Sequence, residues 1–265
     1  MAPEVKSTLK SLLCFLGFVT SSYLVFCAVG DTLLTVKQND KASIQIIKHD
    51  AYTVGYNLHN LTPDWVAWSL DSNRVNKKAV SRDNESFSTD PMANGRKVTT
   101  FDYSRSGYDR GHLCPAADNR FDQKAMTESF YLTNIAPQDH DLNAYTWCDL
   151  ETACRFWAKK TTLYIVAGVI TDAKPRRIGD AGVAVPSYFW KVILKQYKGR
   201  WEAAGFIFTN MPHTEDFHQG ACTVDAIEAL TQLDFFSTLP DSVEEEVEAS
   251  YEPDAWRYPS LQKHN

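Results

Sequence analysis

Residues 102–113 read DYSRSGYDRGHL and form the most informative segment of this 265-residue chain. The segment places an imidazole, His112, two residues after a guanidinium, Arg110, with Gly111 between them. An arginine is a planar, bidentate donor whose geometry matches phosphate oxygens, and a glycine lets the backbone approach its neighbours closely. The pattern predicts that His112 is presented at a strand end, beside an arginine suited to phosphate.

A second polar segment, NIAPQ at residues 134–138, precedes a predicted helix. Asp141 is a good N-cap residue, and the residues after it predict a helix from Leu142 through Trp157. Four residues recur at every fourth position and would form a ladder along one helical face: Asn143, Trp147, Glu151 and Arg155. Because an amide oxygen is a hard ligand suited to Mg²⁺, the ladder predicts polar groups that converge on one ion.

The remaining apolar segments predict the fold class. Five segments rich in β-branched and aromatic residues have strand length: 53–57, 65–70, 163–170, 189–194 and 203–208. A second helix is expected over residues 223–233, a long loop over 73–99, and a short strand or turn over 122–131. Early strands, a central helix and later strands favour an α+β domain with a central, mostly antiparallel sheet flanked by helices.

On these motifs the chain resembles the DNA/RNA non-specific endonucleases of the ββα-metal (His-Me finger) class, which include endonuclease G. The family signature is a D-R-G-H motif, an N-x-x-P-Q segment, and an asparagine and a glutamate at helical spacing, and this chain has all of them in order. The resemblance extends from about Asp50 to Pro240 and includes VPSYFWK at 185–191. It implies a ββα-metal motif in an endonuclease domain at residues 51–240, with DNA and RNA as substrates.

The resemblance also implies the chemistry of the site. His112 would be the general base that takes a proton from the attacking water. Asn143 would be the direct protein ligand of one Mg²⁺ ion, with Mn²⁺ as the alternative, and Glu151 would hold the metal through a water. The metal would polarise the phosphate and assist the leaving 3′-oxygen, so the products would carry 5′-phosphates.

Three arginines and two further residues complete the roles that the resemblance implies. Arg110 and Arg155 would be catalytic and substrate-binding residues that neutralise charge in the transition state. Arg82, just before the segment FSTDP, would be a further substrate-binding arginine. Asn134 would orient the catalytic site, and Asp109 would hold the loop.

The N-terminus predicts export from the cytosol. Two lysines precede residues 12–30, a run that is almost free of charge and rich in Leu, Phe and Val. This is the layout of a signal peptide, with small residues at a cleavage site before Asp31. The run is also long enough to span a bilayer, so membrane attachment through residues 11–30 is the alternative. We expect residues 1–30 to be a signal peptide or an anchor, and the protein to be secreted, periplasmic or membrane-anchored.

The composition and charge fit an enzyme rather than a stoichiometric nucleic-acid binder. Hydrophobic residues make up 44% and charged residues 23% of the chain, which is typical of globular domains. The net charge of −6 disfavours a protein that coats nucleic acid but leaves room for a locally basic cleft. Residues 31–50 are expected to be a polar linker, and residues 241–265 an acidic surface tail without apolar periodicity.

Other readings stay open at this stage. A catalytically silent domain that only binds nucleic acid would keep the same fold, and a phosphodiesterase for small substrates would keep the same motif, because the motif specifies phosphate chemistry and not the base. A serine hydrolase is disfavoured because no G-x-S-x-G elbow is present. His140, His213 and His218 are expected to be surface or structural residues. The cysteines after residue 30 permit disulfides, and their spacing assigns no pairing.

Overall fold

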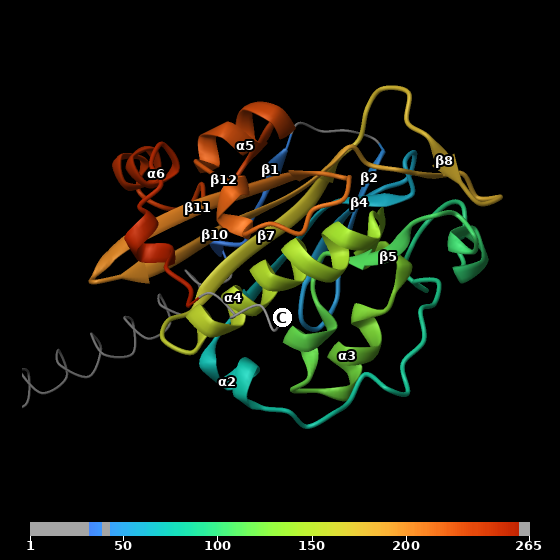
Figure 1. Cartoon of the computed structure of the whole chain (residues 1–265), viewed down its shortest axis with the longest axis horizontal. Coiled ribbons are helices and arrows are strands. Elements are labelled where there is room, and N and C mark those ends of the chain that lie inside the picture. Colours follow the sequence, from blue (N-terminus) through green and yellow to red (C-terminus); the bar gives the residue numbers. More distant parts are fainter. Residues whose placement is uncertain (1–31, 39–42, 260–265) are drawn as a thin grey trace, which may run out of the picture.

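A seven-stranded antiparallel sheet forms the centre of the computed structural model, which describes residues 32–38 and 43–259 (Figure 1). The strand order is β12-β11-β10-β7-β4-β3-β2. The strands are β2 (Ile44–Lys48), β3 (Thr53–Asn57), β4 (Thr62–Leu70), β7 (Leu163–Ile170), β10 (Tyr188–Tyr197), β11 (Arg200–Thr209) and β12 (Ala221–Cys222). The prediction of an α+β fold with a central antiparallel sheet is confirmed.

Both faces of the sheet are covered by apolar clusters. Successive side chains of a strand point to opposite faces, so neighbouring residues join different clusters. Val66 joins the apolar cluster that packs on α4 (Cys148–Ala158). Its neighbour Ala67 joins the cluster that packs on α5 (Val224–Thr231) and α6 (Asp241–Glu248). Figure 1 shows α4 on one side of the sheet and α5 and α6 on the other.

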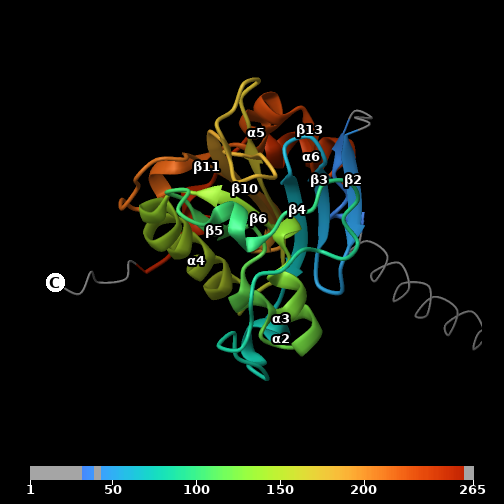
Figure 2. The ribbon, with the colours of Figure 1, turned by 90° about the vertical axis from the view of Figure 1, so that its right-hand side faces the viewer.

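A small hairpin and a long helix form a ββα unit on the α4 side of the sheet. The hairpin consists of β5 (Asp109–His112) paired antiparallel with β6 (Ile135–Gln138). A π-helical segment, η4 (Leu142–Trp147), follows and continues directly into α4. Figure 2 shows β5 and β6 beside α4, in front of the sheet.

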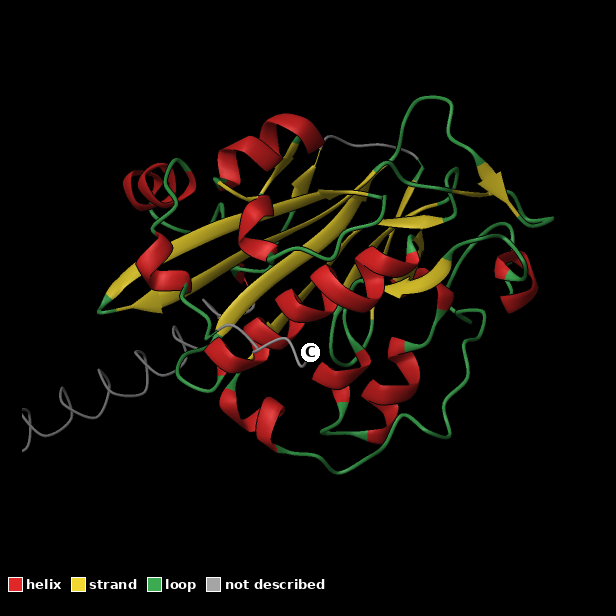
Figure 3. Cartoon of the chain, viewed as in Figure 1, coloured by secondary structure: helices red, strands yellow, loops and turns green. Residues whose placement is uncertain are grey.

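Short elements cover the edges of this core (Figure 3). The remaining helices are α2 (Ser72–Asn76), α3 (Gln123–Ser129) and the 3₁₀ turns η1 (Thr100–Tyr103), η2 (Ala116–Asn119), η3 (Leu132–Asn134), η5 (Phe217–Gly220) and η6 (Pro253–Trp256). The remaining strands form two pairs, β1 (Lys37–Gln38) with β13 (Leu233–Asp234) and β8 (Arg177–Ile178) with β9 (Val183–Ala184).

Most of the predicted elements form within a few residues of their expected bounds. All five predicted strands belong to the central sheet, as β3, β4, β7, β10 and β11. The helix predicted from Leu142 is present, although its first part is π-helical. The helix predicted over 223–233 is α5, and the loop predicted over 73–99 is irregular apart from the end of α2.

The prediction of a strand or turn over residues 122–131 was wrong, because this segment contains α3. The side chain of Asp122 accepts hydrogen bonds from the backbone N–H groups of Lys124 and Ala125, which caps the helix. Ala125 and Met126 are fully buried and hold α3 against the core. With only seven residues, the helix is too short to produce a clear apolar period.

The prediction of a polar linker over residues 31–50 was also wrong. This segment contains β1 and β2, and β2 is an edge strand of the central sheet, paired with β3. Ile47 is buried and Ile46 is exposed, as expected for a strand with one covered face. Because only one of its five residues is fully buried, the strand shows no clear alternation of apolar and polar residues in the sequence.

The acidic tail predicted over residues 241–265 packs on the core as far as the described chain extends. Its first part is α6, and the Trp256 side chain, further on, is fully buried. The Trp256 ring lies 5.2 Å from the ring of Trp157 in α4. A single buried tryptophan in a polar segment produces no apolar period, which is why the sequence pattern indicated a surface appendage.

Across residues 32–38 and 43–259, no helix is both long enough and apolar enough to cross a membrane. The signal peptide or anchor predicted over residues 1–30 lies outside the described residues.

Candidate active site

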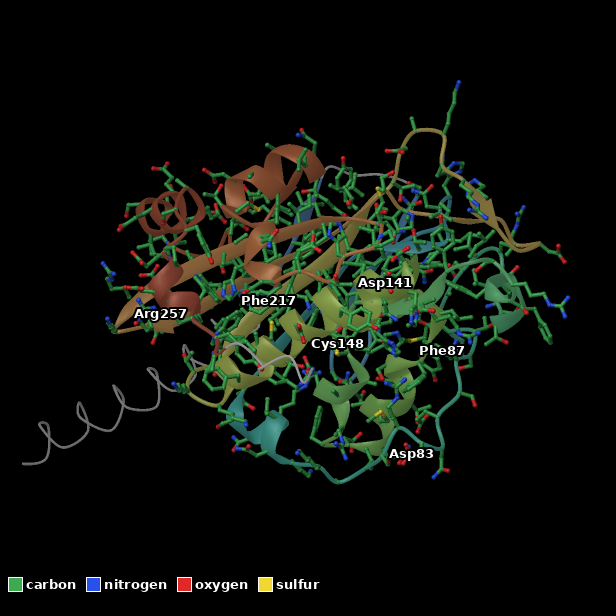
Figure 4. The ribbon with its side chains drawn as sticks, viewed as in Figure 1. Asp83, Phe87, Asp141, Cys148, Phe217 and Arg257 are labelled. Atoms are coloured by element: carbon green, nitrogen blue, oxygen red, sulfur yellow. The ribbon has the colours of Figure 1, made fainter. Side chains whose placement is uncertain are left out.

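The β5–β6 hairpin presents Arg110 and His112 on one face of β5, because residues two apart in a strand share a face. The Phe87 ring contacts both side chains: it lies 5.0 Å from the Arg110 guanidinium and 5.3 Å from the His112 ring, measured between centroids for the two rings. Figure 4 labels Phe87 on the long loop that follows α2. The predicted pair, the His112 imidazole and the Arg110 guanidinium, therefore packs against one aromatic ring, that of Phe87.

The surroundings of His112 favour its neutral form. Its ring packs between Phe87 and Phe130, with the Phe130 ring centroid at 5.1 Å. Burial, together with the positive charge of Arg82, lowers the pKa of His112 to about 3. The Nε2 atom is buried and has no hydrogen-bond partner among the described residues. At neutral pH the ring is uncharged, which is the form in which a general base must begin.

Gly111 is required by the close approach of the two hairpin strands. A Cβ atom at this position would lie 2.2 Å from Oε1 of Gln138 on β6. Any larger residue would push the strands apart and move the flanking Arg110 and His112.

Asn134 supports the segment that follows His112. Its side-chain oxygen accepts the N–H of Cys114, and its amide nitrogen donates to the carbonyls of Cys114 and Ser129. The residue is fully buried. Its amide is therefore committed to backbone groups, which fixes the segment after His112.

Asn143 lies in the π-helical segment and is held by Asp109. Its amide nitrogen donates to Oδ2 of Asp109 at 2.9 Å, and His140 lies 2.9 Å from the same oxygen. A carboxylate can only accept, so the nitrogen must face Asp109 and the oxygen Oδ1 must face away. The described residues form no hydrogen bond to this Oδ1, which leaves it available as a ligand.

The start of the helix differs from the prediction. Asp141 lies inside the first helical turn, and its side chain caps no N–H group of the helix. The cap is Asp139, whose carboxylate accepts from the N–H groups of Asp141 and Leu142. The π-helical turn also breaks the predicted period of four residues between Asn143 and Trp147.

Trp147 belongs to the core and does not line a polar face. It is almost fully buried, and its Nε1 donates to the backbone oxygen of His112 at 3.3 Å. This bond attaches the helix to β5. Trp147, one of the four residues of the predicted ladder, therefore holds the ββα unit together.

Glu151 and Arg155 lie together on α4, with Oε2 of Glu151 and Nη1 of Arg155 separated by 4.0 Å. Burial raises the pKa of Glu151 to about 7, while the charges of Lys191, Arg155 and Arg82 oppose this rise. Arg155 also donates to Asp118 at 3.2 Å. Glu151 itself makes no hydrogen bond with its side chain in the described part of the chain, so its oxygens are open to a cation or a water.

These donors fit one hard cation with mostly water ligands. Asn143 offers a free amide oxygen and Glu151 a free carboxylate, both of which Mg²⁺ accepts. Among the residues that the structure describes, no three His, Cys, Asp or Glu ligands converge here, which disfavours a zinc site. The four cysteines at positions 114, 148, 154 and 222 are free thiols.

Arg82 is an exposed side chain on the loop after α2, and its guanidinium lies 5.6 Å from the centroid of the Phe130 ring. Its charge lowers the pKa values of both His112 and Glu151. Arg82 is therefore close to both groups and remains accessible to a polyanion.

Three residues of the site were missed by the sequence reading. Phe87 supports Arg110 and His112, Asp118 holds Arg155, and Lys191 faces Glu151 from the sheet. Lys191 is fully buried, and its Nζ lies 4.3 Å from the Trp147 ring and 5.7 Å from the Trp68 ring without a hydrogen-bond partner among the described residues. A lysine inside the apolar run of β10 was the available signal.

His140, His213 and His218, which were expected to be surface or structural residues, lie in local contacts. His140 pairs with Asp109, which raises the pKa of His140 above its usual range. His213 bonds to Thr209 and Glu215. His218 bonds to Asp216 and to the backbone of the C-terminal segment.

Comparison with known proteins gives the family. A family model described as DNA/RNA non-specific endonuclease matches residues 30–242. The chain belongs to this family. It is therefore a member of a nuclease family of hydrolases, and its fold and site motifs agree with that membership.

Relatives from distant organisms support the assignment. The chain is 32% identical to a nuclease of Nostoc over 210 residues, which is 75% of each protein. It is 33% identical to the human mitochondrial endonuclease G over 183 residues, 64% of this chain and 62% of that protein. It also spans 60% of the mitochondrial nuclease EXOG of Danio rerio, at 33% identity over 71% of this chain.

A solved structure shares the fold. The crystal structure of an EndoG/EndoGI complex, described as explaining EndoG inhibition, superposes with a TM-score of 0.70 and 29% identity. The match covers 75% of this chain and 88% of that chain. The seven-stranded sheet and its flanking helices are thus an EndoG-like fold.

Proposed function

We propose that the protein is a metal-dependent endonuclease that hydrolyses phosphodiester bonds of both DNA and RNA, with His112 as the general base. The observation that carries this proposal is the neutral imidazole of His112, which shares the Phe87 ring with Arg110. A general base must be unprotonated at working pH, and an adjacent guanidinium can hold the phosphate that is attacked.

The nitrogen of His112 that takes the proton is inferred from burial. Nε2 is enclosed and out of reach of solvent, whereas the residue as a whole is partly exposed. Nδ1 is therefore the ring atom that would accept the proton of the attacking water, with the ring hydrogen on Nε2. Phe87 and Phe130 would keep the ring in this orientation.

The arginines would bind and neutralise the phosphate. Arg110 would contact the reacting phosphate, and the exposed Arg82 would contact the nucleic-acid backbone. Arg155 is held by Asp118 and would neutralise charge beside Glu151. No base-reading pattern of side chains is part of this set, which supports activity on both DNA and RNA.

Asn143 would bind the metal directly through Oδ1, and Glu151 would hold it through a water. Mg²⁺ is the ion we propose, with Mn²⁺ as an alternative that accepts the same oxygen ligands. When bound, the metal would polarise the phosphate and assist the leaving 3′-oxygen, which gives 5′-phosphate ends. Asp109 would fix the Asn143 amide with its oxygen toward the ion.

The test is digestion of plasmid DNA and of RNA with Mg²⁺, with and without EDTA. We expect both substrates to be degraded to 5′-phosphate ends, and EDTA to stop both reactions. Binding without cleavage would indicate a silent domain. Cleavage of small phosphodiesters but not of nucleic acid would indicate a different substrate class, and digestion in excess EDTA would exclude the metal-dependent mechanism.

We further propose that residues 1–30 direct the protein out of the cytosol. The charged start and apolar run support a signal peptide, with a membrane anchor through residues 11–30 as the alternative. N-terminal sequencing of protein from its native host distinguishes the two: a chain that begins near Asp31 supports cleavage, and an intact chain in the membrane fraction supports an anchor. Full-length protein in the cytosol would contradict both.

A further inference from the structure

Three carboxylates meet between α5 and α6, on the opposite side of the sheet from α4 (Figure 1). They are Asp225 and Glu228 of α5 and Glu248 at the end of α6. Each offers an oxygen that lies within 4.8 Å of the others. This cluster is separate from the proposed catalytic residues and has no role in the proposed function.

Glu248 distinguishes this cluster from an ordinary acidic surface. It is only 5% exposed, and its Oε1 is buried with no hydrogen-bond partner in the described part of the chain. A buried carboxylate without a donor is costly to the fold. A carboxylate oxygen of Glu248 lies within 4.8 Å of those of Asp225 and Glu228, and a cation between them would satisfy all three.

Most of the charged groups near Glu248 are acidic. The acidic residues Glu228, Glu244, Asp225 and Asp234 lie near Glu248 and disfavour its charged form. A cation in this region, Lys37, pairs with Asp234 at 3.3 Å and is largely exposed. A bound cation would relieve the mutual repulsion of these carboxylates.

We propose that Asp225, Glu228 and Glu248 bind a Ca²⁺ ion that fastens α6 to α5. Ca²⁺ binds carboxylate oxygens at about 2.3–2.6 Å, so two oxygens of one shell can lie up to about 5 Å apart, which the cluster satisfies. Asp225 is exposed, which leaves room for water ligands on the outer side. One oxygen of Glu228 already accepts the N–H of Phe235, which orients this carboxylate.

The position of the site suggests its task. The family match ends at residue 242, and Glu248 lies beyond it. Val247, next to Glu248, is buried in the cluster formed with α5 and the sheet. The ion would therefore attach the C-terminal segment of this chain to the endonuclease domain, and the site would be a property of this chain's extension.

The experiment counts bound Ca²⁺ per chain by equilibrium dialysis with radiolabelled calcium. Four forms are compared, all in an Asn143→Ala background that removes the proposed catalytic ligand: the otherwise unchanged chain, Glu248→Gln, Asp225→Asn and Glu246→Gln. Glu246 is an exposed residue of the same helix, so Glu246→Gln is a matched control for charge.

We expect Glu248→Gln to bind one Ca²⁺ fewer than Glu246→Gln, and Asp225→Asn to bind about tenfold more weakly. Ca²⁺ should raise the Tm of the control and not that of Glu248→Gln. Asp225→Asn changes an exposed side chain, so it tests the site even if Glu248→Gln folds poorly. Equal calcium counts in Asp225→Asn, Glu248→Gln and Glu246→Gln would overturn the proposal and leave Glu248 as a buried, protonated acid.

This comparison is independent of the proposed catalytic function. If Asn143 is not a metal ligand, an additional bound ion appears equally in all the variants, and the difference between Glu248→Gln and Glu246→Gln persists.

Discussion

The His112 imidazole and the Asn143 amide lie on different elements and have different proposed tasks, so their variants should fail in different ways. Removing the base, in His112→Ala, should lower turnover by about 10²–10⁴-fold while metal affinity is kept. Asn143→Ala should lose metal affinity, and excess Mg²⁺ should restore part of its rate. The measurement is the cleavage rate as a function of Mg²⁺ concentration. Rescue of His112→Ala by metal, without rescue of Asn143→Ala, would show that the two roles are reversed.

Glu151 gives the site a pH dependence whose sign follows from its pKa. The pKa is raised to about 7, so the carboxylate binds a proton below this pH and must release it before it can help to hold a cation. Mg²⁺ affinity should therefore rise with pH up to about 7 and then level off. Calorimetric titrations in buffers of different ionisation enthalpy should show proton release on binding below that pH.

The buried Lys191 lowers the midpoint of this pH dependence, against the larger effect of burial. Its charge lowers the pKa of Glu151, so Lys191→Met should move the midpoint upward by about one pH unit. Lys195 is a matched control, because it is buried on the same face of β10 and donates to the backbone of Ala255 instead. Lys195→Met should leave the midpoint unchanged. An unchanged midpoint in Lys191→Met would show that Lys191 serves packing alone.

At this scale the sequence motifs contain the proposed reacting groups but not the residues that support them. His112, Arg110 and Asn143 stand in motifs whose residue types carry the chemistry. Lys191 and Asp118 act through burial, and burial depends on how the sheet, α4 and η2 pack together. A charged residue in a strand pattern is ordinarily assigned to the solvent face. The apolar run around Lys191 indicated burial, but its position beside Glu151 depends on the packed fold.

At the scale of elements, apolar content decided which segments could be predicted. The central strands β7, β10 and β11 are buried on both faces and form continuous apolar runs in the sequence. The edge strand β2 and the short helix α3 bury only a few side chains, so their sequences resemble loops. The π-helical turn at Asn143 could not be predicted. Six residues are too few for its hydrogen-bond pattern to produce a recognisable period of apolar residues in the sequence.

The C-terminal segment makes the element-scale prediction on stability. Trp256 is fully buried against Trp157, so Trp256→Ala should lower the free energy of unfolding by about 3–5 kcal/mol. Leu230→Ala is the control, because this leucine is 59% exposed and should have little effect. Urea unfolding followed by fluorescence or circular dichroism measures both. A change below about 1 kcal/mol in Trp256→Ala would show that the segment is not part of the folded core.

Two groups of charged residues in the described part of the chain lie on opposite sides of the sheet. The carboxylates of α5 and α6 gather on one side of the sheet, whereas Arg82, Arg110 and Arg155 lie around the ββα unit on the other. The net charge of −6 therefore does not describe the field at the site. A polyanion would be repelled by the α5–α6 side and attracted to the ββα side, which orients its approach.

This division predicts how salt acts on the enzyme. Each arginine that neutralises a phosphate displaces a counterion, so substrate affinity should fall as salt increases, and losing one contact should reduce the log–log slope by about 1. Arg82→Ala should show this smaller slope, with a similar loss on DNA and RNA because phosphate contacts are not sequence-specific. Arg257→Ala is the control: this arginine is 80% exposed, and Figure 4 labels it at the opposite end of the molecule from Phe87. The measurement is KM over a series of KCl concentrations with one DNA and one RNA substrate. If Arg82→Ala and Arg257→Ala kept the same slope as the unchanged chain, Arg82 would not contact the phosphate backbone, and the attraction at the site would have to come from Arg110 and Arg155.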